Sequence, residues 1–481
     1  MTPRAVARLA APLLALVAAT LLAPLGLALW DGELLGAFAY GLTTALAGLL
    51  AALLARLGRG ADDAIHRKDA IGVVVLVWLA MSVLGALPFL IDGSIPTLPA
   101  AIFETASGFT TSGGSVIPDV EMLSRATNLW RCEMHLIGGM GIVVLFVAVF
   151  PQLGVGAKQL FKVEVPGPQS EGLRPKIKQT ALALWWIYGG LTLVCAGLYV
   201  VGGMPVYDAI CHAMSTLGTG GFSTKVASIG HYQSAFIDWV TIVFMFVAGC
   251  NFGLYYMALR GRWRDLTDNP ELRFYLAVNL AVTLLIAWQI RDVHPEIGES
   301  LRFAGFQVLA VTSTTGYMTE DFDAYPDICR YVLFLCMFMG GCAGSTAGGL
   351  KAVRVLLLIK AIAREIRAAT SPNVVETIKL GVVAIPAPIM SAVLVFFAVY
   401  MAIFALASLT LVALGLDLVS AMTGTIACLS SVGPGLGSVG PTQNFAGVPG
   451  LGQLVLSLCM IAGRLEVFVL LSVLTRELWR R

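Results

Sequence analysis

Four short loops in the sequence carry a hydroxyl side chain two residues before a glycine, a pairing that could bind a dehydrated cation. A cation that leaves water needs replacement oxygens, which rings of backbone carbonyls supply in potassium channels. Turning successive carbonyls inward requires backbone angles that only glycine adopts without a steric penalty. A Ser or Thr hydroxyl adds one more oxygen. The four triplets are Thr111-Ser112-Gly113, preceded by Thr110, then Thr219-Gly220-Gly221, Thr314-Thr315-Gly316 and Ser431-Val432-Gly433.

The position of these triplets matters more than their letters, because Thr346-Ala347-Gly348 and Ser438-Val439-Gly440 fit the same pattern. Each of the four directly follows an apolar stretch of roughly a dozen residues, which is too short to span a bilayer and typical of a re-entrant segment. Non-helical backbone at membrane depth is tolerated only where it is buried in protein or lines a wet cavity. The four stretches are residues 99–109, 206–217, 299–312 and 418–429.

A re-entrant half-helix would point the partially negative end of its dipole at the loop that follows, which favours a cation over an anion. The competing explanation is that glycine merely permits close helix packing, as in membrane GxxxG contacts. That explanation suits glycines inside apolar spans. It does not suit Gly113, Gly221, Gly316 and Gly433, because these lie in loops.

The elements that must position the loops are membrane helices. The 481 residues are 58% hydrophobic and only 12% charged, about half the charge of a soluble domain. Nine Cys without CxxC pairs and five His without clustering predict neither a disulfide framework nor a metal site. The start, with Arg4 and Arg8 before an apolar run, resembles a secretory signal but is long enough to be a first transmembrane helix. Apolar spans are expected at residues 9–30, 34–55, 70–91, 129–152, 180–202, 234–259, 274–290, 328–360, 384–415 and 449–475.

We therefore predict an all-α integral membrane protein with ten transmembrane helices. Lys and Arg gather in alternate connections and at the C-terminus, which places both termini in the cytoplasm. A unit of span, half-helix, loop and span repeats four times with a period of roughly 100 residues around one expected pore. The predicted segments are an N-terminal two-helix appendage (1–66) and pore repeats at 67–168, 169–266, 267–370 and 371–481.

A glycine-rich segment interrupts the last helix of the third repeat at the middle of the membrane. Each glycine there costs a helix roughly 1 kcal/mol relative to alanine, so the segment favours a break. A kink for close packing and a flexible plug beneath the loops are both open readings. The segment is Gly340, Gly341, Cys342, Ala343, Gly344, Ser345, Thr346, Ala347, Gly348 and Gly349, and Lys351 follows it closely.

Arg464 lies near the middle of the last span, with Glu466 two residues later. A charge inside a membrane is costly and is a functional hypothesis by default. Residues two apart on a helix do not face each other, so the two side chains should have separate partners. A structural tie to another helix is the alternative for Arg464.

The loops at residues 107–113, 215–224 and 432–437 resemble those of the Trk/Ktr/HKT potassium transporters, and the extra N-terminal pair resembles the TrkH/TrkG branch. The resemblance covers essentially the whole chain. It implies a potassium filter with one glycine per loop, an intramembrane gating loop at 340–349, and Arg464 as a positive barrier beside it. Ser431 departs from the Asn common in TrkH-like fourth loops. The resemblance further implies a homodimer in the bacterial inner membrane, bound to a TrkA-like cytoplasmic ring that carries the nucleotide; this chain itself needs no cofactor.

Two other functions compete with a pore, and two charged regions allow more than one interpretation. An intramembrane serine protease would need Ser107 or Ser345 near His135 or His212, and it gives no reason for fourfold repetition. A sodium- or proton-coupled symporter is the closer rival, although secondary transporters usually use two inverted repeats. The acidic run Glu320, Asp321 and Asp323 either concentrates cations at the mouth or is a solvated face. The basic stretches 158–178 and 354–379 either dock a partner or reflect cytoplasmic location.

Overall fold

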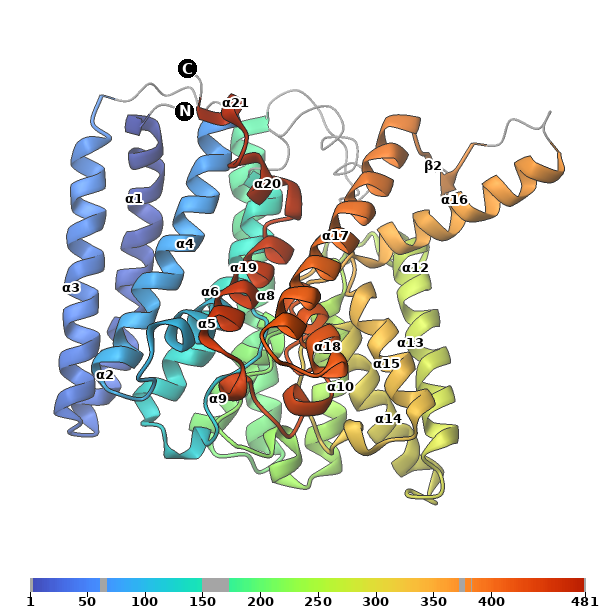
Figure 1. Ribbon diagram of the computed structural model, residues 1–481, viewed down its shortest axis with the longest axis horizontal. Helices are drawn as coiled ribbons and strands as arrows, with labels where there is room; N and C mark the ends of the chain where they lie inside the picture. Colours follow the sequence, from blue (N-terminus) through green and yellow to red (C-terminus); the bar gives the residue numbers. More distant parts are fainter. Residues whose placement is uncertain (1–2, 61–66, 149–172, 372–376, 382, 480–481) are drawn as a thin grey trace.

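A computed structural model describes residues 3–60, 67–148, 173–371, 377–381 and 383–479, and these are mostly helical (Figure 1). The N-terminal helices are rich in Ala and Leu, which favour helix. They stand at one end of the molecule, where α1, α3 and α4 pack side by side. These elements are α1 (Pro3–Thr20), α2 (Leu22–Trp30), α3 (Leu34–Leu57) and α4 (Arg67–Ile91).

The rest of the chain alternates long helices with short ones. The short helices α5, α9, α14 and α18 match the four predicted apolar stretches to within about two residues, as expected for helix ends, so that prediction is confirmed. The next elements are α5 (Leu98–Phe109), η1 (Val120–Met122), α6 (Arg125–Ala148), α8 (Leu173–Val201), α9 (Val206–Gly218), η3 (Ser228–Tyr232), α10 (Ala235–Gly249), α11 (Phe252–Leu259), α12 (Trp263–Thr267), α13 (Pro270–Gln289), α14 (Ile297–Thr312) and η4 (Phe322–Ala324).

The C-terminal part completes the bundle and adds a small hairpin. The pairing of Lys379 with Ala384 and of Leu380 with Val383 is antiparallel, a feature that an all-α prediction missed. Figure 1 shows α16 projecting away from the bundle. The last elements are α15 (Asp327–Met339), α16 (Ala352–Thr370), β1 (Lys379–Leu380), β2 (Val383–Ala384), α17 (Ala387–Ala413), α18 (Leu418–Leu429), η5 (Gly437–Val439), η6 (Phe445–Gly447), α19 (Gly450–Arg464), α20 (Val467–Ser472) and α21 (Arg476–Trp479).

Each short helix packs against at least two other helices. Each one contacts the long helix before it, in the pairs α4 with α5, α8 with α9, α13 with α14 and α17 with α18. Each short helix also contacts a second helix, which belongs to another predicted repeat, in the pairs α6 with α9, α10 with α14, α15 with α18 and α19 with α5. The last of these contacts joins α19, near the end of the chain, to the first short helix, so the four contacts form a closed ring.

Within the described residues, six helices are long and apolar enough to cross a membrane by length and composition. The bent pair α10 and α11 would be a seventh. The six are Pro3–Trp30, Leu34–Leu57, Ile71–Ile91, Ala181–Val201, Pro270–Gln289 and Ala387–Ala413.

Three of the predicted spans are broken rather than continuous. Span 234–259 bends by 93° between α10 and α11, where the Asn251 side chain accepts a hydrogen bond from Gly253 N–H and caps the second helix. Span 328–360 ends as a helix at Met339, and α16 is a separate helix. Span 449–475 breaks after Arg464, because Glu466 has a left-handed φ of 59°.

Candidate functional site

The four predicted loops share one backbone conformation. In each, the hydroxyl residue donates its N–H to the carbonyl three residues earlier, and the next residue donates to the carbonyl five residues before it. This is the usual end of a helix with a left-handed residue, a place that glycine normally takes. Here it is taken by Thr111 (φ 54°), Thr219 (φ 55°), Thr314 (φ 58°) and Ser431 (φ 59°).

A β-branched residue in the left-handed region is strained, and such strain gathers at functional sites. Three of the four residues are threonines. Glycine would end these helices at a lower cost. The Thr and Ser residues at this position carry a hydroxyl group that glycine lacks, so we infer that the hydroxyl group is the reason for their presence.

The glycines two residues later bring the loops into contact with one another. All four have positive φ, from 75° to 100°. At each, a Cβ atom would come within 2.0–2.8 Å of a carbonyl oxygen in the next loop, closer than any real contact. Only glycine fits there. The approaches are Gly113 to the carbonyl of Gly220, Gly221 to that of Thr315, Gly316 to that of Val432, and Gly433 to that of Ser112.

The order of these approaches is closed, because loop 1 (111–113) faces loop 2 (219–221), loop 2 faces loop 3 (314–316), loop 3 faces loop 4 (431–433), and loop 4 faces loop 1. The four carbonyls involved all belong to the residue directly before the glycine. Equivalent oxygens from four loops thus lie around a common centre. Such a set can replace the water shell of a cation.

The hydroxyl groups of the loops are buried and differ in their partners. Among the described residues, the oxygens of Thr111 and Ser431 have no hydrogen-bond partner. Thr219 donates to the carbonyl of its neighbour Gly218 at 2.7 Å. The hydroxyl of Thr314 accepts a hydrogen bond from the N–H of Gly348, which lies outside the loop. A buried, unpartnered oxygen calls for an explanation, and coordination of a cation provides one.

A cavity of about 120 Å³, here named the outer cavity, opens onto the loops. It is lined by Gly113, Gly221 and Gly316, and by Pro434, which follows Gly433. Polar side chains such as Ser115 also line the cavity. Loops 1 to 3 and the residue directly after loop 4 therefore border one polar vestibule.

The glycine-rich segment lies against the C-terminal ends of three of the short helices. Gly348 donates its N–H to the hydroxyl of Thr314 at 2.8 Å. The hydroxyl of Thr346 donates to the carbonyls of Leu217 (3.0 Å) and Ala248 (3.2 Å). A Cβ on Gly348 would lie 2.2 Å from the carbonyl of Ser430. The segment therefore touches the bases of loops 2, 3 and 4 without any helical structure between Gly340 and Lys351.

Arg464 is 1% exposed and contacts this segment directly. Its guanidinium donates to the carbonyl of Thr346 at 2.6 Å and to that of Gly138 at 2.9 Å. Glu466 instead pairs with Arg354 at 2.6 Å. The prediction of separate partners is confirmed, although the helix break after Arg464, rather than helical spacing, separates the two side chains.

Glu271 was missed by the sequence prediction, yet it joins the glycine-rich segment to the start of α16, the helix that follows it. Its Oε1 accepts the N–H of Ala343 at 2.7 Å and that of Val353 at 3.1 Å. Lys351, between them, donates its ammonium to the carbonyl of Ala347. An acidic residue near the start of an apolar span was the available signal. Its partners are set by tertiary structure alone.

The other predicted polar groups have mainly structural partners. His135 lies against Ser215 (3.1 Å), and His212 against Ser223 (2.9 Å). The described hydrogen bonds do not join either His to Ser107 or Ser345, which is the pairing a protease would need.

The acidic run is engaged rather than freely solvated. Glu320 pairs with His294 at 3.0 Å, and Asp323 pairs with Arg330 at 2.8 Å. Asp323 also accepts the N–H of Gly437 at 2.9 Å, beyond loop 4. These carboxylates therefore hold the chain after loop 3 to its neighbours.

The basic stretches predicted as docking faces are only partly visible. Residues 158–172 lie outside the described residues. In the second stretch Arg354 is buried against Glu466, whereas Arg367 and Lys379 are exposed. The exposed basic groups of this stretch are thus on the projecting α16 and the hairpin.

Comparison with known proteins gives consistent relatives. The family model described as "TrkH: Cation transport protein" matches residues 49–478. The chain is 40% identical over 423 residues to the Trk system potassium uptake protein TrkH of Salmonella typhimurium, covering 86% of each chain. It is 37% identical over 489 residues to TrkH of Vibrio parahaemolyticus, covering 99% of each. The crystal structure of the potassium transporter TrkH from Vibrio parahaemolyticus matches with a TM-score of 0.91 at 35% identity, covering 100% of both chains.

Proposed function

Because this chain belongs to the TrkH family of cation transport proteins, we propose that it takes up potassium across the bacterial inner membrane through a gated, channel-like pore. The observation that carries this proposal is the closed order of four loops, each with a left-handed hydroxyl residue and a glycine that faces the next loop's carbonyl. The names of the relatives, all potassium uptake proteins, support transport rather than enzymatic catalysis.

Within this proposal the oxygens of Thr111, Thr219, Thr314 and Ser431, with the carbonyls just above them, form the selectivity filter. The buried, unpartnered hydroxyls of Thr111 and Ser431 support a role in coordination. Ser431 keeps the oxygen and the backbone angle of the threonines without their methyl group. Loop 4 therefore supplies the same hydroxyl oxygen as the other three loops, but it lacks the methyl group that their threonines pack.

The proposed architecture is ten membrane spans, with an N-terminal pair followed by four repeats with the boundaries given above. The closed contacts of α6, α10, α15 and α19 with successive short helices support four units around one axis. In the count of ten, the pairs α10 with α11, α15 with α16 and α19 with α20 are spans broken by non-helical segments. Both termini are proposed to be cytoplasmic, and the start of α1 and α21 lie at the same end of the molecule in Figure 1.

The glycine-rich segment and Arg464 are proposed to be the gate. The segment reaches the bases of three loops, and Arg464 places a buried positive charge on its Thr346 carbonyl. A cation leaving the loops inward would meet both. Regulation is proposed to come from a homodimer bound to a TrkA-like nucleotide-binding ring, with α16 as one candidate contact.

Rubidium uptake in a cell that lacks its own potassium uptake tests the proposal, with sodium as competitor. In Gly316→Ser the added Cβ would lie 2.0 Å from the carbonyl of Val432, so discrimination against sodium should fall. Gly298→Ser is the matched control, because Gly298 lies near the start of α14, the helix that leads into loop 3, with open space around it.

Equal discrimination in wild type and Gly316→Ser, at equal protein abundance, would remove the filter assignment. Strict dependence of uptake on a sodium or proton gradient would instead favour a coupled symporter. In proteoliposomes that have only a potassium gradient, the proposed pore passes rubidium although neither a sodium gradient nor a proton gradient is present.

A further inference from the structure

Each short helix carries a polar side chain, here named a strut, that hydrogen-bonds to the chain just beyond the loop that follows the helix. Seven residues before the left-handed hydroxyl residue, three of the short helices carry a polar side chain that hydrogen-bonds to the chain just beyond the same loop. In the fourth helix that position is Gly424, and its neighbour Thr423 makes the bond. The struts are Glu104 to Val116 N–H (2.9 Å), His212 to Ser223 (2.9 Å), Gln307 to Thr319 (3.2 Å) and Thr423 to Leu436 N–H (2.9 Å).

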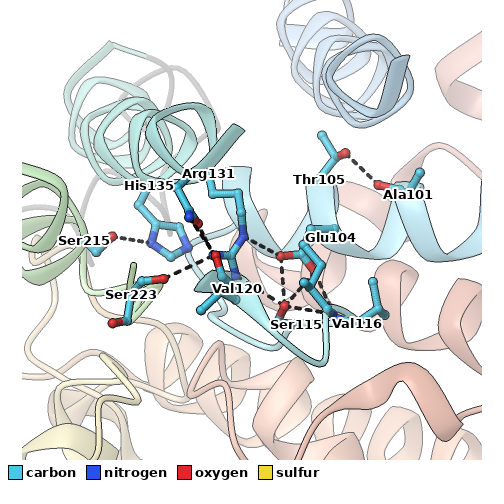
Figure 2. A network of polar contacts seen from close by, with 12 residues as sticks. Ala101, Glu104, Thr105, Ser115, Val116, Val120, Arg131, His135, Ser215 and Ser223 are labelled. Atoms are coloured by element: carbon cyan, nitrogen blue, oxygen red, sulfur yellow. Dashed lines mark hydrogen bonds and ion pairs between the residues drawn. The ribbon is translucent and has the colours of Figure 1, made fainter. Parts of the chain in front are cut away.

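The strut of loop 1 differs from the others because it is a carboxylate in an ion pair. Glu104 is fully buried, and its Oε1 accepts from the Nε of Arg131 at 2.8 Å (Figure 2). The same carboxylate accepts from the hydroxyl of Ser115 at 3.0 Å and from the N–H of Val116. Its acceptor positions are thus divided between Arg131 and the chain beyond loop 1.

Arg131 extends this contact to loop 2. It is 1% exposed and donates to the carbonyl of Ser223 at 3.2 Å, two residues beyond Gly221. Its guanidinium also lies 4.1 Å from the ring centroid of Phe222. His135, one turn along α6, stacks on the same ring at 4.1 Å. Two side chains of α6 therefore contact Phe222, the residue directly after the glycine of loop 2. Glu104 in turn binds the chain just after loop 1.

Stability alone does not account for this pair. A buried ion pair is often no more stabilising than apolar residues of the same volume. What it provides is direction, because bonds between charged groups are short and geometrically specific. Coordination that distinguishes two alkali cations depends on the placement of the oxygens, and this pair connects two of the four loops that supply them.

The pair also bears on the charge of the vestibule. Arg131 lines the outer cavity, where an unpaired guanidinium would repel an arriving cation. Glu104 offsets that charge from behind. Removing Glu104 alone would thus both release loop 1 and expose a positive charge, whereas removing both partners would release the loops and keep the vestibule neutral.

We propose that Glu104 and Arg131 are positioning residues that join loops 1 and 2 and so set the discrimination between potassium and sodium. The proposal rests on the filter function proposed above. Glu104 accepts from Arg131 with one carboxylate oxygen and from Val116 with the other, whereas Glu104→Gln keeps only one acceptor oxygen and so cannot serve both. Arg131→Gln loses the reach to loop 2. The double variant Glu104→Gln/Arg131→Gln buries no lone charge, so it is the sample that decides if either single variant fails to reach the membrane.

The experiment measures the ratio of rubidium to sodium uptake for the full-length chain in proteoliposomes. The ratio should fall about tenfold in the double variant, because the oxygens of loops 1 and 2 lose the bonds that hold them in place; a tenfold fall corresponds to about 1.4 kcal/mol of discrimination. Total uptake should be lower in Glu104→Gln than in the double variant. The matched control is Asp238→Asn, since Asp238 pairs with Arg302 at 3.6 Å between α10 and α14, and this largely buried pair makes no hydrogen bond to the four loops within the described part of the chain.

A folded double variant with the wild-type ratio overturns the proposal. An equal fall in Asp238→Asn also overturns it, because general loosening would then explain the effect. Gly316→Ser separates this failure from failure of the filter itself. If Gly316→Ser lowers the ratio and the pair variants do not, only the pair is refuted; if none lowers it, the filter falls as well.

Discussion

Replacing Arg464 by alanine should increase the basal flux of potassium. Arg464 donates to the carbonyls of Thr346 and Gly138, and its guanidinium is almost wholly buried. Alanine removes both the positive charge and the bond that holds the glycine-rich segment. Each change lowers the barrier to a cation moving inward from the loops.

The size of the effect follows from the geometry. The guanidinium lies 2.6 Å from the Thr346 carbonyl oxygen. A potassium ion touching that oxygen would be roughly 6 Å from the charge, and at an effective dielectric constant of about 20 the repulsion is about 3 kcal/mol. Such a barrier slows passage about 100-fold. Neighbouring carbonyls offset part of this repulsion, so we expect basal flux to rise about 10- to 100-fold in Arg464→Ala.

Rubidium efflux from proteoliposomes containing this chain alone measures the basal flux. Arg464→Lys is the control, because it keeps the positive charge and reaches fewer carbonyls. Low flux in the lysine variant with high flux in the alanine variant assigns the barrier to charge. Unchanged or abolished flux in folded Arg464→Ala would refute the barrier.

Three further predictions concern the gate and the packing behind the loops. Gly348→Ala should raise basal rubidium flux several-fold, because its Cβ would lie 2.2 Å from the carbonyl of Ser430 and displace the segment; wild-type flux would contradict this. Glu271→Gln should raise basal flux less than Arg464→Ala does, since the amide oxygen can still accept from Ala343 and Val353 but without charge; a larger rise than in Arg464→Ala would contradict this ranking. Gly463→Ala should lower the free energy of unfolding by about 1–3 kcal/mol, as its Cβ would lie 1.9 Å from the carbonyl of Leu429; an unchanged melting temperature in detergent would argue against this.

The sequence predicted the short helices and the loops well, because both depend on local chemistry. An apolar stretch too short to span, followed by a hydroxyl residue and a glycine, identified the ends of α5, α9, α14 and α18. The left-handed angle at Thr111 and its three counterparts follows from the same local ending of a helix.

The breaks in the long spans could not be predicted as reliably, because they depend on contacts distant in sequence. The bend before α11 brings the N–H of Phe252 to the carbonyl of Gly344, 92 residues away. The turn at Glu466 accompanies its ion pair with Arg354. Hydropathy reports only that such segments are apolar.

The polar groups behind the loops were missed for a related reason. Glu104, Arg131 and Glu271 each stand out as charges in apolar sequence, which marks them as functional candidates. Their partners, however, come from other helices. Only the folded chain shows that Glu104 contacts Arg131 and that Glu271 contacts both the glycine-rich segment and the start of α16.

The most direct test of the central claim is to locate the ion. Crystals of the full-length protein grown in rubidium should show anomalous scattering at the centre of the four loops, within contact of the carbonyls of Ser112, Gly220, Thr315 and Val432. Gly316→Ser crystals should lose or weaken that peak. Flux-competent wild-type protein with no rubidium between the four loops, or with rubidium bound only elsewhere, would contradict the account.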